Sequence, residues 1–343
     1  MEKSEKSLNM AFERVTYIYT TNPSFSYRLV SLLLAKGEFF MDKKVTYHEQ
    51  TDVDNTLRLR DVLKTLPPFC RDFFRAIEPR TTTKTRISYA YDIRIFFQFL
   101  LEQNPAFKDW SMDAFTVDVL DQITAVDLEE YEEYLKVYQA GDKTETNGER
   151  GLKRKMSSLR SFYAYYFKRE MIHTNPTVLV DVPKIHQKSI IRLEADEVAL
   201  LLDYIEHGGD ELTGQKKVYY EKTKDRDLAL VTLLLGTGVR VSECVGLDIE
   251  DVDFKNNGIK VTRKGGNEMV VYFGPEVEKA LKNYLEVRKN IIPVEGHEHA
   301  LFYSTQRKRI GVQAVENLVK KYARQVTTTK KITPHKLRST YGT

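Results

Sequence analysis

The sequence predicts a mainly α-helical protein with one small antiparallel sheet, divided into two domains. The chain of 343 residues is long enough for two hydrophobic cores. Apolar residues recur at helical spacing through long segments, of which 83–103 is the clearest. Two β-branched segments flank the pair Gly265-Gly266, a pattern typical of a β-hairpin. Between these regions, residues 176–189 hold two prolines and little periodicity, which indicates an extended connection.

Composition argues against several classes of protein. The net charge of +4 is too small to identify a nucleic-acid-binding protein by itself. Cys70 and Cys244 lie far apart and form no CxxC pair, which fits a reducing cytoplasm without a disulfide or zinc framework. Residues 1–7 lead into no apolar core, so no signal peptide is expected. The most apolar N-terminal stretch, Leu29–Ala35, is far shorter than the roughly 20 residues of a membrane span. We therefore expect a cytoplasmic protein that does not enter a membrane.

Residues 1–65 form an N-terminal extension whose role the sequence does not reveal. Asn22 and Pro23 can begin a helix that ends at Gly37, because Asn caps a helix, Pro suits its first turn and Gly its exit. Val45–Tyr47 is either a short strand or irregular.

Residues 66–176 are predicted to form a helical domain. The predicted helices are Phe69–Ile77, Thr83–Gln103, Asp127–Tyr138 and Arg150–Arg169, with a polar loop at Gly141–Glu149 before the last of them. The residues expected to face inward are Ile87, Tyr91, Ile95 and Phe99 in the second helix and Leu128, Tyr131 and Leu135 in the third.

A basic linker, 177–191, leads to a domain of mixed pattern, 192–343. The predicted helices are Asp196–Ile205, Arg226–Leu235, Glu276–Lys289 and Gly311–Arg324, and the predicted strands are Gly258–Thr262, Met269–Phe273 and Ala300–Tyr303. The last of these helices should bury Val315, Leu318, Val319 and Tyr322. A final short helix should follow Pro334.

The helix predicted over 150–169 contains seven basic residues and no acidic one. Its core face should hold Leu152, Met156, Leu159, Tyr163 and Phe167. The opposite face collects cations and hydroxyls, namely Arg150, Lys153, Ser157, Arg160, Ser161 and Lys168. Such a face can lie against DNA phosphates and release their counterions. The simpler interpretation is a solvated helix with a chance run of positive charges.

Three motifs follow one another in the C-terminal half. The first is Gly236-Thr-Gly-Val-Arg-Val-Ser-Glu243, the second is the hairpin tip Arg263-Lys-Gly-Gly266, and the third is Thr333-Pro-His-Lys-Leu-Arg338. Arginine, hairpin lysine and His-x-x-Arg in this order resemble the tyrosine recombinase family, which includes phage integrases and Xer proteins. The resemblance covers about residues 70–343. The segment Leu66-Pro-Pro-Phe-Cys-Arg-Asp-Phe-Phe74 looks closest to the single-component Xer recombinases of Gram-positive bacteria.

The resemblance implies a clamp that holds double-stranded DNA between a helical domain and a catalytic domain. It also implies inverted-repeat half-sites, a homo-tetramer on two DNA sites and strand exchange through a Holliday junction. An Xer-type member would serve chromosome partition at cell division. Two alternatives remain open: an integrase of a phage or mobile element, and a catalytically inactive DNA-binding relative.

Transfer of a phosphodiester without a metal needs positive charge on the nonbridging oxygens, a proton for the leaving oxygen and a nucleophile. Arg240 and Arg338 can supply the charge, because a guanidinium forks onto two phosphate oxygens. Glu243 is expected to pair with Arg240 and hold it. Lys264, aimed by the tight turn, is the candidate general acid, and His335 can either donate a hydrogen bond to the phosphate or manage the nucleophile's proton. Rivals of Lys264 are Arg263 and Lys260.

In the family the attacking tyrosine lies some tens of residues beyond His-x-x-Arg, and it leaves a 3′-phosphotyrosine and a free 5′-hydroxyl. Bond energy is conserved, so the reaction requires no ATP and no metal. The expectation from the resemblance is therefore that this nucleophile follows Thr343. Tyr341 stands where the family carries a packing aromatic residue, and Tyr303 and Tyr322 look like core residues.

No metal or nucleotide cofactor is expected. His297-Glu-His299 has no third ligand in register and reads as a surface loop. Gly236-Thr-Gly lacks the Gly-Lys-Ser/Thr ending of a phosphate loop. The acidic run Asp248–Asp253 lacks the spacing of an EF-hand and is predicted to be a solvated turn.

Overall fold

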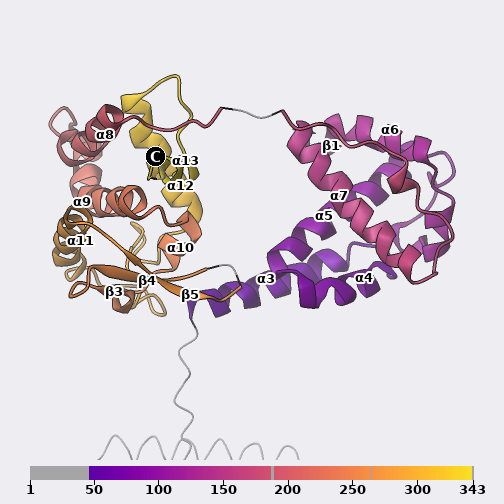
Figure 1. Ribbon diagram of the computed structural model, residues 1–343, viewed down its shortest axis with the longest axis horizontal. Helices are drawn as coiled ribbons and strands as arrows, with labels where there is room; N and C mark the ends of the chain where they lie inside the picture. The colour runs from indigo at the N-terminus through magenta and orange to yellow at the C-terminus, as the bar shows by residue number, and fades with distance from the viewer. Residues whose placement is uncertain (1–45, 187–188, 264, 342–343) are drawn as a thin grey trace, which may run out of the picture. The chain divides into compact units, whose positions relative to one another are not determined.

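The computed structural model describes residues 46–186, 189–263 and 265–341, and the structural statements below concern these residues (Figure 1). The helix predicted from Asn22 to Gly37 and the hairpin residue Lys264 lie outside the described residues. The predicted fold class is confirmed, because the chain is mostly helical with small antiparallel sheets. The predicted domain boundaries stay a prediction.

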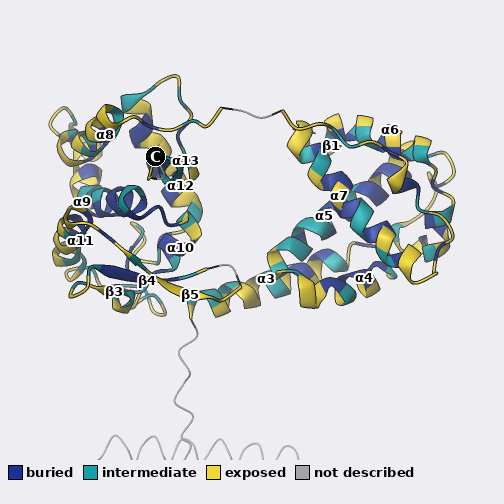
Figure 2. Cartoon of the chain, viewed as in Figure 1, coloured by how far each residue is buried: buried dark blue, intermediate teal, exposed yellow. Residues whose placement is uncertain are grey.

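The first part of the chain packs five helices around one core. They are α3 (Tyr47–Leu63), α4 (Cys70–Ile77), α5 (Thr83–Gln103), α6 (Ala125–Lys136) and α7 (Glu149–Lys168). A two-stranded antiparallel hairpin, β1 (Val137–Ala140) and β2 (Lys143–Thr146), stands between α6 and α7. A single buried cluster runs from Leu59 to Val180 and is rich in aromatic rings (Figure 2). Because Leu59 and Val62 belong to this cluster, α3 packs on the same core as the helices that follow it.

The hairpin corrects one prediction, since a polar loop was expected at Gly141–Glu149 and the third helix was expected to reach Tyr138. Instead α6 ends at Lys136, and Val137 pairs with Thr146 across the two strands. Alternating threonines on β2 favour an extended backbone, and the Gln139 side chain donates to Thr144 Oγ1 at 3.0 Å across the ladder. For Val45–Tyr47, predicted as a strand or irregular, Val45 lies outside the described residues, Thr46 is irregular and Tyr47 begins α3.

The inward face of α5 differs from the predicted stripe. The buried residues at its centre are Ile93, Phe96 and Phe97, whereas Tyr91 and Ile95 are half-buried. A stripe drawn every four residues drifts by about 40° per step around a helix of 3.6 residues per turn, so it leaves the core face. In α7 the predicted core residue Phe167 is 47% exposed, again because it ends such a stripe.

A buried carboxylate joins α5 to α7. Asp92 is 3% exposed, and Arg154 binds it with both terminal nitrogens at 2.5 and 2.8 Å. Ser158 Oγ donates to the same carboxylate at 2.7 Å. The buried Lys155 donates to the Asn147 side chain at 3.1 Å, which ties the hairpin exit to α7. Burial raises the pKa of Asp92 and lowers the pKa of Lys155, and the neighbouring opposite charges offset this cost.

The second part of the chain combines helices with a three-stranded sheet. The helices are α8 (Ala195–His207), α9 (Gly214–Thr237), α10 (Val241–Gly246), α11 (Pro275–Arg288), α12 (Val312–Val326) and α13 (Pro334–Tyr341). The antiparallel sheet has the order β3 (Val252–Asp253), β4 (Gly258–Thr262), β5 (Glu268–Tyr272). Helix α9 is central, because α8, α10, α11 and α13 all pack against it.

Most predicted elements of this part are present, with two corrections. Helix α9 begins at Gly214 and not near Arg226. The prediction missed its first turns because they are solvent-exposed and carry no apolar stripe. The segment Ala300–Tyr303 forms no strand, since its two ends make only isolated bridges to Asp248 and Arg309. No helix among the described residues is both long enough and apolar enough to cross a membrane.

The Asp92 network leads to a stability prediction. Replacing Asp92 with Ala removes the buried acceptor of Arg154 and Ser158 and the neighbouring opposite charge of Lys155, so we expect a loss of about 3 kcal/mol in the free energy of unfolding. Chemical denaturation followed by circular dichroism measures this loss. The matched control is Asp61→Ala, which removes an exposed pair with Lys64 and should cost about 1 kcal/mol or less. Equal losses in the two variants would show that Asp92 does not hold the helices together.

Candidate active site

Arg240 stands at the N-terminus of α10 and is held by Glu243. The Arg240 backbone N–H donates to Glu243 Oε2 at 2.8 Å, and Nη1 donates to Oε1 at 2.7 Å. The Glu243 side chain is 4% exposed and the Arg240 side chain is 53% exposed. The predicted ion pair is therefore present. It anchors one nitrogen of the guanidinium and leaves the rest facing outward.

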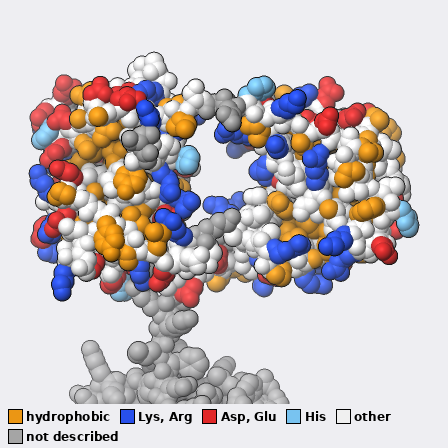
Figure 3. All heavy atoms as spheres, in the orientation of Figure 1, with side chains coloured by type: hydrophobic (Ala, Val, Ile, Leu, Met, Phe, Trp, Pro, Cys, Tyr) orange, Lys and Arg blue, Asp and Glu red, His pale blue; other side chains and the backbone are white. Residues whose placement is uncertain are grey.

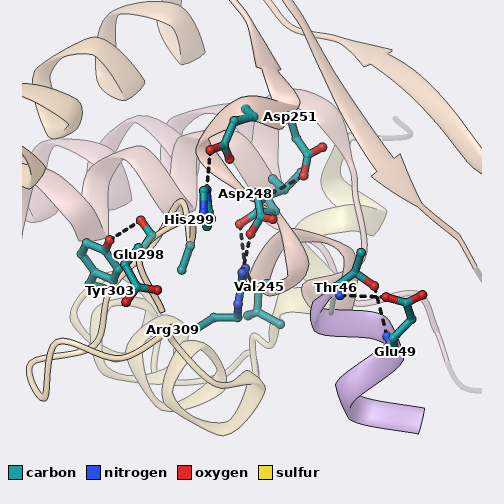
Figure 4. Close-up of polar contacts among 12 residues, drawn as sticks. Thr46, Glu49, Val245, Asp248, Asp251, Glu298, His299, Tyr303 and Arg309 are labelled. Atoms are coloured by element: carbon teal, nitrogen blue, oxygen red, sulfur yellow. Dashed lines mark hydrogen bonds and ion pairs between the residues drawn. The ribbon is translucent and has the colours of Figure 1, made fainter. Parts of the chain in front are cut away.

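The other end of α10 is also capped, by a residue that the sequence did not single out. Arg309 Nη1 donates to the backbone carbonyls of Val245 at 3.1 Å and Leu247 at 2.8 Å, and Nη2 pairs with Asp248 (Figure 4). These carbonyls have no partner inside the helix, so Arg309 fixes the end of the short helix that carries Arg240. The cap is formed across 64 residues, which is why no local pattern indicated it.

Helix α13 carries the predicted His335 and Arg338 on one face, as their spacing requires. Pro334 and Leu337 are buried and seat the helix on α9. The Thr340 hydroxyl accepts a hydrogen bond from Leu193 N at 3.1 Å. The predicted short helix is therefore present. Its His335 is exposed, its Arg338 is half-buried, and neither side chain pairs with another side chain in the described part of the chain.

A close contact brings α13 to the turn before Arg240. Gly238 ends α9 with φ +58°, and its N–H donates to Leu234 O at 3.1 Å. A Cβ on Gly238 would stand 2.5 Å from Cδ1 of Tyr341, so the Tyr341 ring lies directly on this turn. Tyr341 is one helical turn from Arg338, and Gly238 is two residues from Arg240. The two arginines therefore belong to the same region of the surface.

The hairpin that carries Lys264 is as predicted, although Lys264 itself lies outside the described residues. The N–H of Arg263 donates to Asn267 O at 2.8 Å, which closes the tip between β4 and β5. Gly265 and Gly266 have φ +91° and +81°, a region that favours glycine. The rival Lys260 is already engaged, because its Nζ lies 3.4 Å from Glu268 and 3.8 Å from Asp251.

Two tyrosines were expected to be core residues, and both are buried. Tyr303 is 2% exposed and Tyr322 is 1% exposed. The Tyr322 hydroxyl donates to the buried Asp227 at 2.9 Å, and burial beside that carboxylate raises the pKa of Tyr322. Neither side chain can attack a phosphate from this position. Tyr341, in contrast, is 54% exposed at its outer edge and packs on Gly238.

The segment His297-Glu-His299 and the acidic run Asp248–Asp253 both form hydrogen bonds within the protein. His299 Nδ1 lies 2.5 Å from Glu250 Oε1, and the Glu298 backbone carbonyl accepts from the Tyr303 hydroxyl. In the acidic run, the Asp248 N–H donates to Asp251 Oδ2 at 2.9 Å at the start of a short 3-10 turn (Figure 4). No group of three or more His, Cys, Asp or Glu side chains suited to a metal occurs among the described residues.

On the basic face of α7, some side chains are exposed to solvent and one binds the protein itself. Arg150, Ser157 and Lys168 are exposed, and Lys153 and Ser161 are half-buried. Arg160 has a second role, because its Nε and Nη2 donate to the backbone carbonyls of Thr177 at 3.1 Å and Val180 at 2.5 Å. It therefore fastens the segment that leaves the helical part, and Nη1 alone remains for another partner. On the face shown in Figure 3, basic side chains gather over α5 and α7, whereas acidic ones lie mainly over α6.

The Gly238–Tyr341 contact generates a prediction about the shape of the site. Gly238→Ala adds both a strained φ and a clash with the Tyr341 ring, so it should destabilise the protein by at least about 1 kcal/mol more than Gly296→Ala. Gly296 is a matched control, because it has φ +82° but open space around its Cβ position. Thermal and chemical unfolding of both variants measure the difference.

A second variant isolates the clash from the strain. Adding Tyr341→Ala to Gly238→Ala should recover part of the lost stability, since the two residues are in contact and their effects are not additive. Strictly additive losses, or equal losses for the two glycine variants, would refute the packing of Tyr341 on this turn.

Sequence comparison gives consistent matches. Residues 192–343 match the phage integrase family. Tyrosine recombinase XerC of Caldanaerobacter subterraneus subsp. tengcongensis is 34% identical over 288 residues, which cover 81% of this chain and 74% of that protein. Tyrosine recombinase XerS of Streptococcus uberis is 29% identical over 313 residues, which cover 81% of this chain and 84% of that protein.

Solved structures share the fold. The XerH site-specific recombinase bound to a palindromic difH substrate, in a post-cleavage complex, is similar with a TM-score of 0.55 and 18% identity, over 76% of this chain and 67% of that one. The Tn1549 transposon integrase in complex with circular intermediate DNA has a TM-score of 0.52 and 21% identity, over 79% of this chain and 84% of that one. At these identities the likeness concerns the fold alone.

Proposed function

This chain belongs to the tyrosine recombinase (phage integrase) family and is a site-specific DNA recombinase of the Xer type, and we propose that Arg240, Lys264, His335 and Arg338 are its phosphate-activating residues. The observation that carries this proposal is the anchoring of Arg240. Its partner Glu243 is almost wholly buried, so the pair holds a partly exposed guanidinium in a defined place without consuming all of its donors. Such preorganised charge is what a phosphoryl-transfer site requires.

In the proposed reaction, Arg240 and Arg338 bind the nonbridging oxygens of the scissile phosphate. A tyrosine hydroxyl gives its proton to His335 or to water as its oxygen attacks phosphorus, the bond to the 5′-oxygen breaks, and a 3′-phosphotyrosine forms. Lys264 gives the proton that the leaving 5′-oxygen takes up, and His335 donates a hydrogen bond to the phosphate. In the second step a 5′-hydroxyl from the partner strand attacks the phosphotyrosine and releases the tyrosine. Because each step exchanges one phosphoester for another, no external energy source is needed.

The helical part is proposed to hold the DNA backbone. Arg150, Lys153, Ser157, Ser161 and Lys168 on α7 present donors to solvent, and Arg160 contributes its remaining nitrogen. Contacts of this kind position a duplex without reading its sequence. We propose a domain division at 66–176 and 192–343, with the basic linker 177–191 between them.

The biological setting is also a proposal. The relatives XerC and XerS are named tyrosine recombinases, which supports a role in chromosome partition at cell division for a cytoplasmic protein. A homo-tetramer on two DNA sites, each with inverted-repeat half-sites, would be the working assembly. Selection of bound sequences from random duplexes tests this setting, because it should return an inverted repeat. Recovery of sequences without symmetry would argue against such sites.

The arginine roles predict a separation of binding from chemistry. Arg240→Ala or Arg338→Ala should lower the rate of strand cleavage by at least about a hundredfold, since each removes one preorganised donor. The dissociation constant for the duplex should change little. A nicked suicide substrate measures cleavage, and fluorescence anisotropy measures binding.

The control for these variants is Arg324→Ala, which removes an exposed arginine from the end of α12. It should leave cleavage unchanged. A cleavage loss that only parallels a loss of affinity in the Arg240 and Arg338 variants would mean that these residues bind DNA without assisting the reaction.

The role of Lys264 is tested with a substrate whose leaving group is changed. Lys264→Ala should slow cleavage of an ordinary substrate, and a substrate with a 5′-thiol leaving group should restore the rate, because a thiolate leaves without a proton. Arg263→Ala on the same hairpin is the control, and it should show no such rescue. If the thiol substrate reacts no faster with Lys264→Ala, another group is the acid.

A further inference from the structure

Two arginines from different helices share one tyrosine ring on the helical part. Arg58 of α3 donates from Nε and Nη2 to the Tyr91 hydroxyl at 3.3 and 3.2 Å, and its Cζ lies 5.6 Å from the ring centroid. Arg94 of α5 places its Cζ 4.9 Å from the centroid of the same ring. The contact joins α3 and α5, which Figure 1 also shows beside each other. Both guanidinium groups are therefore held by the same side chain.

This pair lacks a counter-charge. Neither Arg58 nor Arg94 forms an ion pair with a carboxylate in the described part of the chain, whereas Arg86, Arg154 and Arg226 each do. The Nε of Arg94 is buried and has no hydrogen-bond partner there. A buried donor without an acceptor costs about 1–3 kcal/mol, and two like charges near one ring add repulsion. A phosphate bound near the two guanidinium groups would offset the repulsion between their charges.

The guanidinium fork suits both a carboxylate and a phosphate, and the proposed function selects a phosphate of DNA as the ligand. Two guanidinium groups offer several N–H donors in fixed planes, which matches the oxygens of a phosphodiester. The tyrosine platform reduces the side-chain freedom that a phosphate would otherwise have to restrict. The site lies on α3 and α5, and α5 is joined to the basic helix α7 through Asp92 and Arg154.

We propose that Arg58 and Arg94, held on Tyr91, bind a phosphate of the DNA backbone. This proposal rests on the proposed function and extends the DNA-binding surface from α7 to α5 and α3. It gives a role to α3, which precedes the predicted helical domain and for which the sequence indicated none. The contact is to backbone, so it strengthens binding to every sequence alike.

The test is the salt dependence of binding to a mixed-sequence duplex, measured by fluorescence anisotropy with the full chain. Arg58→Gln should weaken binding several-fold at low salt and should lower the slope of log K against log salt by up to about one. The double variant Arg58→Gln/Arg94→Gln should lower this slope by the full amount of about one. The matched control is Arg60→Gln/Arg71→Gln, which removes two exposed arginines of α3 and α4 that pair with no described side chain. It should change the slope less.

Arg58 is exposed, so Arg58→Gln keeps the fold, which circular dichroism verifies independently of the Arg94 change. An unchanged slope in Arg58→Gln, or an equal decrease in the control, overturns the proposal and leaves an acidic protein partner as the alternative ligand. Lys153→Ala separates this failure from a failure of the proposed function. If Lys153→Ala lowers the slope and Arg58→Gln does not, only the Arg58–Arg94 site is wrong. If the wild-type protein binds no duplex, the proposed function itself fails.

Discussion

The buried carboxylate of Glu243 is the constraint on which the proposed active site depends. A buried carboxylate needs hydrogen-bond donors around it, and here the donors are the backbone N–H and the guanidinium of Arg240. The same bonds therefore stabilise the start of α10 and fix the arginine. Arg309 closes the other end of that helix, so the loop that carries Arg240 is held at both sides.

Buried carboxylates that pair with an arginine also occur elsewhere in the chain. Burial raises the pKa of Asp92 and of Asp227, and in each case an adjacent arginine opposes the effect. Asp92 with Arg154 joins α5 to α7, and Asp227 with Arg226 joins α9 to Tyr322 of α12. The acids of the interior thus orient arginines that connect helices.

Eight arginines of this protein form two groups. Arg154, Arg226, Arg309 and Arg288 spend their donors on carboxylates or backbone carbonyls of the protein. Arg338, Arg58 and Arg94 pair with no carboxylate among the described residues, and Arg240 is anchored but half exposed. A guanidinium without a protein counter-ion has most to gain from a phosphate, so the second group is where contact with DNA is to be sought.

The sequence by itself determined the helices with strong apolar faces, the hairpin around its Gly pair, and the order of Arg240, Lys264 and His335-x-x-Arg338. These depend on local spacing, which a single sequence displays directly. It did not determine the exposed start of α9 or the hairpin beside α6, because polar residues show little periodicity. Only the tertiary structure decided which face of α5 is buried, that Tyr341 lies on Gly238, that Arg309 caps α10 and that Arg58 meets Arg94 on one ring. Each of these contacts joins residues far apart in the chain, and their geometry is set by how helices pack and not by any local pattern.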